Sequence, residues 1–474
     1  MRGEPSPFVQ YLEYGKQVST KKTQTIFARA TGAGRAGVAI VRVSGPDADV
    51  CLKTLTKTTL PKPRLASLRN LYAADGSIID QALVLRFKTP HSFTGEDLVE
   101  LHIHGGEAVF NLLSDTLYHM GLSQAEAGEF TKRAFENGKL DLTEAEGLAD
   151  LIDAQSEGQR RQALRQMSGG LRAEYESWRE DLITLLALID GELDFPDEGD
   201  VPQNLSHRAS AGLDELAQIL TAALVTSHKG EKIRHGLDVV VLGAPNAGKS
   251  SIINGLAKRD VAIVSNTPGT TRDIIEVHLE IGGLPVRLTD TAGLRESEDQ
   301  IEIEGVKRAR AKITNADIRI VMIDGMSPSI PTTIFDEILS TDLVVVSKND
   351  LLDQSGRGDV GNLVQNLVGQ KEIQVIFVNT YDKDDINTVW TALEKRVLQL
   401  FGATETAGLT RARHRDCVER ALKSVKSARH MLKTTPELAG ADLISALHAL
   451  KELAGETDIE AVLDRVFSSF CIGK

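Results

Sequence analysis

Short runs rich in apolar residues, separated by stretches long enough for helices, mark the middle of the chain from about residue 236 to residue 401. Such runs, bounded by polar segments, are typical of buried strands. They cover residues 239–242, 274–279, 286–288, 318–323, 343–346 and 375–378. Because strands that alternate with helices usually form a parallel sheet with helices on both faces, the pattern predicts an α/β domain. Nucleotides bind such sheets at the carboxyl ends of the strands.

Helical periodicity fills the chain on both sides of this region. Residues 141–225 are rich in Ala, Leu, Glu, Gln and Arg, and a similar composition returns after about residue 409. These residue types, recurring at helical spacing, predict long helices. Because two helical stretches flank a self-contained α/β unit, we expect the α/β domain to be inserted into one helical domain.

The N-terminal part alternates short strands with one helix. Strands are predicted at residues 26–28, 37–43, 82–85 and 98–104, and a helix at residues 107–120. This pattern predicts a mixed α/β domain that ends near Gly138. Residues 1–22 carry four basic and two acidic residues, which is a weak signal for a targeting segment.

A phosphate-binding loop follows the first strand of the central domain. Residues 243–250 read Gly-Ala-Pro-Asn-Ala-Gly-Lys-Ser. A strand that turns through glycine into a helix directs several backbone N–H groups at one point, where the helix N-terminus adds partial positive charge. Lys249 would reach the β- and γ-phosphates, and the Ser250 hydroxyl would complete the coordination of a phosphate-bound Mg²⁺. The predicted nucleotide-binding residues here are Asn246, Ala247, Gly248, Lys249, Ser250 and Ser251.

Three further motifs follow in the order that a GTP-binding domain needs. Residues 269–273 offer a hydroxyl, best placed in Thr271, for the Mg²⁺ shell. At the end of the third strand, Asp290, Thr291, Ala292 and Gly293 supply a second-shell carboxylate and an N–H for the γ-phosphate. Residues 347–350 read Ser-Lys-Asn-Asp, and Asp350 can accept the N1–H and amine hydrogens of guanine while the Lys348 stem lies along the base. The pattern predicts a GTPase.

Two charged residues lie within predicted strands of the N-terminal domain, Arg42 and Glu100. A buried charge is costly unless it is paired or binds something, so a ligand site is one interpretation. Exposed strand faces explain them equally well. His102 and His104 have metal-ligand spacing, but with no third ligand evident we expect a solvent-facing strand.

Composition limits the possible partners. The chain has 474 residues, 41% of them hydrophobic and 26% charged, with a net charge of −13. Without a global basic field, any RNA must be held by local patches or by a partner protein. Arg160, Arg161 and Arg165, and Arg411, Arg413 and Arg415, are candidate patches, although solvated helix faces are the commoner explanation. Three scattered cysteines argue against disulfides and structural zinc, and no apolar run reaches the roughly 18 residues that cross a bilayer.

From about residue 25 to the C-terminus the chain resembles the tRNA-modifying GTPases called MnmE or TrmE. Beside the GTPase motifs, the resemblance is carried by residues 92–97, 128–130, 133–135, 139–142 and the terminal Phe-Cys-Ile-Gly-Lys at 470–474. Residues 302–305 and 409–414 look more like the mitochondrial members, so we expect the mitochondrial matrix, with the bacterial cytoplasm as the alternative.

The resemblance implies a three-part architecture. A mixed α/β folate-binding domain would precede a helical domain into which a Ras-like P-loop GTPase domain is inserted. The predicted boundaries are 1–23 for an N-terminal extension that could be a targeting remnant, 24–139 for the folate-binding domain, 140–235 and 403–474 for the two helical parts, and 236–402 for the GTPase domain. The C-terminal motif belongs to the second helical part.

The resemblance also implies K⁺-activated GTP hydrolysis in a homodimer formed through the GTPase domains. Leu294 can neither position water nor offset charge, so K⁺ would supply the charge, held by Asn246 and by oxygens of Ser265, Thr267 and Thr270. Glu302 would orient the attacking water through another water. A turn-forming Asn246 without a bound ion is the alternative.

In the N-terminal domain, the resemblance implies a folate site at Arg42, Glu100, Lys139 and Lys474. A carboxylate can take two N–H bonds from a pterin ring, and cationic side chains suit an anionic ligand. 5,10-Methylene-tetrahydrofolate would supply the carbon placed on the 5-position of a tRNA wobble uridine, together with an FAD-dependent partner of the MnmG type. Cys471 is either a catalytic thiol or a small buried residue.

The sequence departs from the family pattern at two places. Ser347 replaces the usual asparagine of the guanine motif, and residues 378–381, Val-Asn-Thr-Tyr, replace the usual Ser-Ala loop. We therefore expect weaker GTP affinity with retained guanine preference. The competing hypothesis for the whole chain is a GTP-controlled RNA or ribosome assembly factor without one-carbon chemistry.

Overall fold

The computed structural model describes the chain in segments. The described residues are 24–194, 205–258, 276–290, 311–328, 339–368, 373–402, 408–456, 460–468, 470 and 472–473. They group into two compact units, one drawn from Met1–Leu142 with Ile459–Lys474 and the other from Thr143–Asp458. In the described residues, no helix has the length and apolar character needed to cross a membrane.

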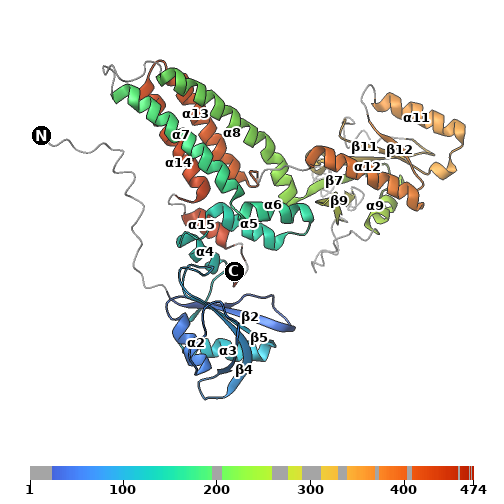
Figure 1. Cartoon of the computed structure of the whole chain (residues 1–474). Coiled ribbons are helices and arrows are strands. Elements are labelled where there is room, and N and C mark those ends of the chain that lie inside the picture. Colours follow the sequence, from blue (N-terminus) through green and yellow to red (C-terminus); the bar gives the residue numbers. More distant parts are fainter. Residues whose placement is uncertain are drawn as a thin grey trace, which may run out of the picture. The chain divides into compact units, whose positions relative to one another are not determined.

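A six-stranded sheet forms the N-terminal domain (Figure 1). Its strands, in the spatial order β3-β4-β5-β2-β1-β6, are β1 (Ile26–Arg29), β2 (Ala36–Ser44), β3 (Ser67–Tyr72), β4 (Ile78–Phe87), β5 (Leu98–Gly105) and β6 (Ser123–Gln124). Neighbouring strands run antiparallel except β1 and β6. The predicted strands are confirmed. Strand β3 was missed because Leu71 is its one buried residue, whereas the helix α2 (Ala48–Thr56) was missed although Ala48, Cys51, Leu52 and Leu55 are buried at helical spacing.

Alternation along the strands decides what each face of this sheet carries. Leu101 and Ile103 of β5 point into the main core, which α2 and α3 (Glu107–His119) complete. The opposite face carries a smaller cluster that includes Phe130 of α4 (Glu129–Glu136). Glu100, His102 and His104 alternate with the core residues of β5 and therefore project on this second face.

The C-terminal segment belongs to the N-terminal unit. Helix α15 (Glu460–Phe467) packs on α4, where the rings of Phe135 and Phe467 are 6.2 Å apart. Ile472 forms a backbone bridge to Ala127. The sequence placed this segment with the helical domain, and the structure groups it differently because its aromatic side chains pack against α4.

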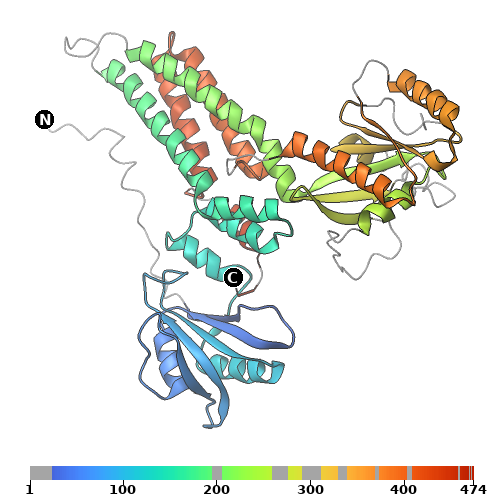
Figure 2. The same ribbon diagram turned by 45° about the vertical axis from the view of Figure 1, so that its right-hand side comes forward.

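The helical domain combines segments from both sides of the central domain. Its helices are α5 (Leu142–Asp153), α6 (Glu157–Met167), α7 (Gly170–Asp194), α8 (Leu205–His235), α13 (Ala412–Met431) and α14 (Pro436–Ala454). Figures 1 and 2 show the green helices α7 and α8 beside the red helices α13 and α14. These four helices share one apolar core that includes Leu182, Leu213, Val425 and Leu450. The predicted insertion of one domain into another is confirmed.

The inserted domain is a six-stranded, mostly parallel sheet. Its strands, in the spatial order β12-β11-β10-β7-β9-β8, are β7 (Leu237–Gly243), β8 (Glu276–Ile281), β9 (Leu284–Asp290), β10 (Ile318–Asp324), β11 (Leu343–Ser347) and β12 (Val375–Phe377). Only β8 is antiparallel to its neighbour. Helices α9 (Lys249–Ala257) and α12 (Lys383–Phe401) cover one face, and α11 (Gln354–Val368) covers the other. This is the predicted P-loop GTPase-like fold.

Candidate functional site

The phosphate loop connects β7 to α9 at the carboxyl end of the sheet. A Cβ atom on Gly243 would lie 2.5 Å from the carbonyl oxygen of Met322, so only glycine fits where β7 passes β10. Gly248, which caps α9, has a φ of +86°, and Asn246 has a φ of 63°. Glycine adopts this left-handed region freely and asparagine tolerates it, which explains both residue types. The loop therefore has the tight turn that a phosphate cradle needs.

Lys249, Ser250 and Asp290 meet at this loop. The Lys249 ammonium is buried and donates to the carbonyl oxygens of Gly243 and Ala244, at 3.1 and 2.9 Å. The Ser250 hydroxyl donates to the Asp290 carboxylate at 3.1 Å, and Asp290 is the last residue of β9. The hydroxyl and the carboxylate assigned to one Mg²⁺ site thus lie together, which fits a hydrated divalent cation with oxygen ligands.

The guanine motif follows β11, two strands from β7. Lys348 adopts a φ of 58°, and its ammonium lies 2.5 Å from the carboxylate of Asp324 at the end of β10. Asp350 lies in a short 3₁₀ turn and is exposed, so its carboxylate is free to accept from a base. Sequence reasoning missed Asp324. The signal for Asp324 was an acid at the end of a buried strand, next to the strand that carries the guanine motif.

The two departures from the family pattern lie against the phosphate loop. Ser347 is fully buried and donates to the Ile323 carbonyl oxygen at 3.3 Å. A Cβ atom on Gly248 would lie 3.5 Å from the Ser347 Cβ and 3.3 Å from a methyl carbon of Thr380. Tyr381, next to Thr380, is 87% exposed and lines a cavity of about 500 Å³ together with Ser251. Both departures can therefore affect how a nucleotide sits on the loop.

Several predicted site residues lie outside the described part of the chain. In the GTPase domain these are Ser265, Thr267, Thr270, Thr271, Thr291, Ala292, Gly293 and Glu302. At the C-terminus they are Cys471 and Lys474. The residues beside them are described: a Cβ atom on Gly473 would lie 2.2 Å from the Arg29 carbonyl oxygen, so the chain passes directly over the end of β1.

Arg42 and Glu100 pair on the second face of the N-terminal sheet. They are cross-strand partners, and the Arg42 Nε lies 2.9 Å from a Glu100 oxygen. The guanidinium also lies over the ring of Phe93, at 5.6 Å. His102 lies 3.5 Å from the other Glu100 oxygen, and its Nε2 is buried without a hydrogen bond. The expectation of a solvent-facing His102 is wrong, whereas His104 is exposed and bonds Asp80.

Residues 92–97 form the loop that joins this pair to Lys139. A Cβ atom on Gly95 would lie 3.4 Å from the Lys139 Cε, and Asn137 donates to the Thr94 carbonyl oxygen. Beneath the loop, Arg133 is buried and holds Glu96 at 3.1 Å and Glu129 at 2.7 Å. Residues 92–97 therefore contact Arg42 through Phe93 and approach Lys139 through Gly95.

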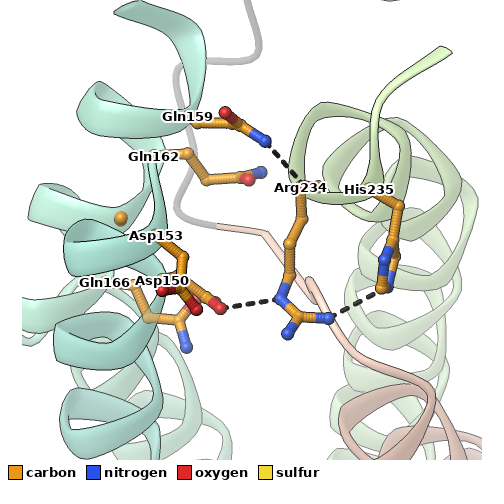
Figure 3. Close-up of a pocket in the computed structure, with 8 residues that line it drawn as sticks. Asp150, Asp153, Gln159, Gln162, Gln166, Arg234 and His235 are labelled. Atoms are coloured by element: carbon orange, nitrogen blue, oxygen red, sulfur yellow. Dashed lines mark hydrogen bonds and ion pairs between the residues drawn. The ribbon is translucent and has the colours of Figure 1, made fainter. Parts of the chain in front are cut away.

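A second polar cluster lies where the helical domain meets the inserted domain (Figure 3). Asp150 of α5 accepts from Arg234, three residues before β7, and from Arg411, which caps α13; both distances are 2.8 Å. The Asp150–Arg234–His235 chain of hydrogen bonds is visible in Figure 3. One oxygen of Asp150 therefore bonds both stretches of the helical domain, Arg234 just before the inserted domain and Arg411 just after it.

Next to it, Glu146 is buried among cations. It accepts from Arg413 at 2.9 Å and from His414 at 2.6 Å, and Arg411 lies 3.7 Å away. Burial would raise the pKa of Glu146, but these neighbours hold it well below its ordinary value. Burial lowers the pKa of His414, whose Nδ1 has no hydrogen-bond partner. A protonated ring would leave that N–H buried and unpaired, which favours the neutral ring that donates from Nε2 to Glu146.

The ion pairs also show how the arginines of the two candidate basic patches are used within the protein. Arg411 and Arg413 pair with Glu146 and Asp150, and Arg415 pairs with Glu231. Arg160 and Arg161 pair with Glu157. Arg411, Arg413 and Arg415 hold the helical domain together and are poor candidates for contacts with RNA, while Arg160 and Arg161 form an ordinary solvated helix face.

Comparison with known proteins identifies the family. The family description "MnmE helical domain" matches residues 142–471, and "GTP-binding protein TrmE N-terminus" matches residues 25–139. The chain is 48% identical to the tRNA modification GTPase MnmE of Maricaulis maris, over 95% of this chain and 99% of the relative. It is 46% identical to MnmE of Phenylobacterium zucineum and 45% identical to MnmE of Caulobacter vibrioides, each over 95% of this chain and 100% of the relative. With its phosphate loop, its inserted GTPase-like domain and these matches, the chain belongs to the MnmE/TrmE family.

Proposed function

We propose that this chain is a GTPase that acts in the modification of tRNA wobble uridine. The observation that carries the proposal is the meeting of Lys249, Ser250 and Asp290 at the loop between β7 and α9. The names of the relatives, tRNA modification GTPase, favour this function over an assembly factor. The direct test is GTP hydrolysis by the purified chain, with Lys249→Ala as the inactive variant and Lys395→Ala, an exposed lysine of α12, as the control.

Lys249 and the loop amides would stabilise the charge that develops on the transferring phosphoryl group. Ser250 and Thr271 would hold Mg²⁺, with Asp290 in its second shell, and the Mg²⁺ would neutralise phosphate charge when bound. On the base side, Asp350 would accept from guanine while Asp324 keeps the Lys348 side chain beside it. The remaining loop residues, Thr291, Ala292 and Gly293, would face the γ-phosphate.

A bound K⁺ would provide the positive charge that an arginine finger provides in other GTPases. Asn246, Ser265, Thr267 and Thr270 would hold it, and Glu302 would orient the attacking water. The left-handed backbone at Asn246 is one that asparagine tolerates, and the asparagine side chain carries the oxygen that a K⁺ ligand needs. Turnover should rise when Na⁺ is replaced by K⁺ at equal ionic strength, and Asn246→Ala should abolish the rise. Equal rates in the two salts contradict the K⁺ site.

The N-terminal domain would bind a tetrahydrofolate derivative through Arg42, Glu100, Lys139 and Lys474. The pair of Arg42 and Glu100 fits such a ligand because Glu100 keeps one oxygen that no arginine of the described residues holds, 3.5 Å from the His102 Nε2, which forms no hydrogen bond. 5,10-Methylene-tetrahydrofolate supplies a one-carbon unit when bound. Glu100→Ala should weaken folate binding in calorimetry, whereas His104→Ala, on the same face of the same strand but exposed, should not. Unchanged affinity in Glu100→Ala would remove Glu100 from the site.

The modification would need further components. An FAD-dependent MnmG-type subunit, a homodimer formed through the GTPase domains and the tRNA itself are the proposed partners. The product would be a carboxymethylaminomethyl or taurinomethyl group, and Cys471 would take part as a thiol only if Cys471→Ser abolishes modification. The relatives compared are bacterial, which favours the bacterial cytoplasm over the mitochondrial matrix expected from residues 302–305 and 409–414.

A further inference from the structure

The outer face of α13 carries a stripe of basic side chains. Lys423, Lys426 and His430 of α13, together with Lys433 two residues beyond the end of this helix at Met431, recur at intervals of three or four residues and are all exposed. Residues at this spacing lie on one face of a helix. The opposite face of α13, which includes Val418, Ala421 and Val425, is buried in the helical core. We call these four residues the α13 lysine stripe; its helical part, from Lys423 to His430, extends over roughly 10 Å at 1.5 Å per residue.

The stripe differs from the other basic groups of this helix because its charges are not neutralised. Arg420 pairs with Asp416 and Glu452, and Arg429 pairs with Asp214 of α8. Within the described part of the chain, the lysines of the stripe form no ion pair. The flanking arginines therefore hold α13 against α8 and α14, while the stripe presents positive charge to solvent.

The neighbouring helices α8 and α14 carry few carboxylates that could neutralise the charge of the stripe. Along α8, residues 216–230 contain no Asp or Glu, and they face the part of α13 between the Asp214–Arg429 and Glu231–Arg415 ion pairs. On α14, the carboxylates between residues 436 and 451 are Glu437 and Asp442. Although the chain has a net charge of −13, a basic stripe with few nearby acids attracts a polyanion locally.

We propose that the α13 lysine stripe binds the sugar-phosphate backbone of the tRNA substrate. This inference rests on the proposed function, because it takes the tRNA from it. Lysine ammonium groups bind phosphates as point charges and position a nucleic acid without reading its sequence. The spacing of Lys423, Lys426 and His430 along α13 suits neighbouring phosphates of one strand. The stripe replaces the arginine cluster at 411–415, whose charges are paired within the protein, and the cluster at 160–165, where Arg160 and Arg161 pair with Glu157.

The test measures tRNA binding by the full-length chain, alone and with its FAD-dependent partner, at several KCl concentrations. Lys423→Gln, Lys426→Gln and Lys433→Gln are combined in one variant. A matched control carries Lys53→Gln, Lys62→Gln and Lys395→Gln, which remove the same charge from exposed sites elsewhere. Binding by the stripe variant should weaken by about tenfold, and the slope of log K against log salt should fall by about one for each lysine.

GTP hydrolysis without tRNA should be unchanged in both variants, and arginine at the three stripe positions should retain tRNA binding. Equal tRNA binding by the stripe variant and wild type would overturn the proposal. Unchanged tRNA binding with loss of association to the FAD-dependent protein would also overturn it, and would assign the stripe to an acidic protein surface. If the wild-type chain binds no tRNA in either form, the proposed function itself fails, and this outcome is distinct from a failure of the stripe.

Discussion

Glu146→Gln would remove a negative charge from the centre of a buried cluster while keeping the size of the side chain. In the wild type, Arg413 donates to the Glu146 carboxylate at 2.9 Å, His414 donates at 2.6 Å, and Arg411 lies 3.7 Å away. Glutamine can still accept from His414 but cannot offset two guanidinium charges. We therefore expect the variant to fold with a less stable helical domain.

The size of the stability loss depends on the partners that Arg411 and Arg413 retain in the variant. Removing one partner of a buried ion pair costs about 3–5 kcal/mol. Arg411 keeps Asp150, and Arg413 keeps two backbone carbonyl oxygens at 3.0 Å, so the loss should lie at the low end, about 3 kcal/mol. For a unit of this size, that loss corresponds to a fall in the unfolding temperature of roughly 6–12 °C.

The two tryptophans of the chain allow the helical domain to be followed by itself. Trp178 is buried in the helical core, and Trp390 is buried in the core of the inserted domain. With Trp390→Phe in both proteins, the fluorescence of Trp178 reports unfolding of the helical domain. Glu180→Gln, an exposed glutamate of α7, is the matched control and should change stability by less than about 0.5 kcal/mol. A Glu146→Gln variant as stable as this control would refute the role assigned to the cluster.

Three further changes test other parts of the structure. Asp350→Asn should reduce the affinity for GTP and raise that for XTP, because an amide donates to the carbonyl that xanthine carries at C2; a nucleotide competition assay that still prefers GTP would contradict this. Asp324→Asn should free Lys348 and weaken GTP and GDP binding by a similar factor, about tenfold, with unchanged hydrolysis of bound GTP; a loss confined to the hydrolysis rate would exclude a positioning role. Because burial lowers the pKa of His414 below 6.5, its contribution to stability is present above pH 6.5 and falls as the pH drops below it. Trp178 fluorescence should show a smaller loss of stability between pH 7.5 and 5.5 in His414→Gln than in wild type, and an equal loss would contradict a neutral His414.

The central sheet and the phosphate loop were predictable because burial and backbone geometry restrict them to few residue types. Strand β7 is covered on both faces and therefore reads as a continuous apolar run. Gly243 and Gly248 are glycines because any Cβ would collide or strain the backbone. Such local constraints are visible in the sequence alone. The insertion was predictable for a similar reason, since helical composition appears on both sides of one α/β pattern.

Long-range pairing was not predictable from the sequence. Arg411 and Arg413 read as a basic patch, but their partners Asp150 and Glu146 lie more than 250 positions away. His102 was assigned to solvent because alternation places it opposite the main core, and the sequence does not show that Phe130 of α4 and Phe93 pack on that second face. The terminal helix α15 could not be assigned to the N-terminal unit, because its partner α4 is distant in the chain.

The most direct test of the whole account is mass spectrometry of wobble uridines in tRNA from cells that lack this chain. We predict that the 5-substituent on these uridines is lost, that the wild-type chain restores it, and that the Lys249→Ala variant does not. Full modification in the cells without the chain, or full restoration by Lys249→Ala, would contradict a GTPase function in tRNA modification.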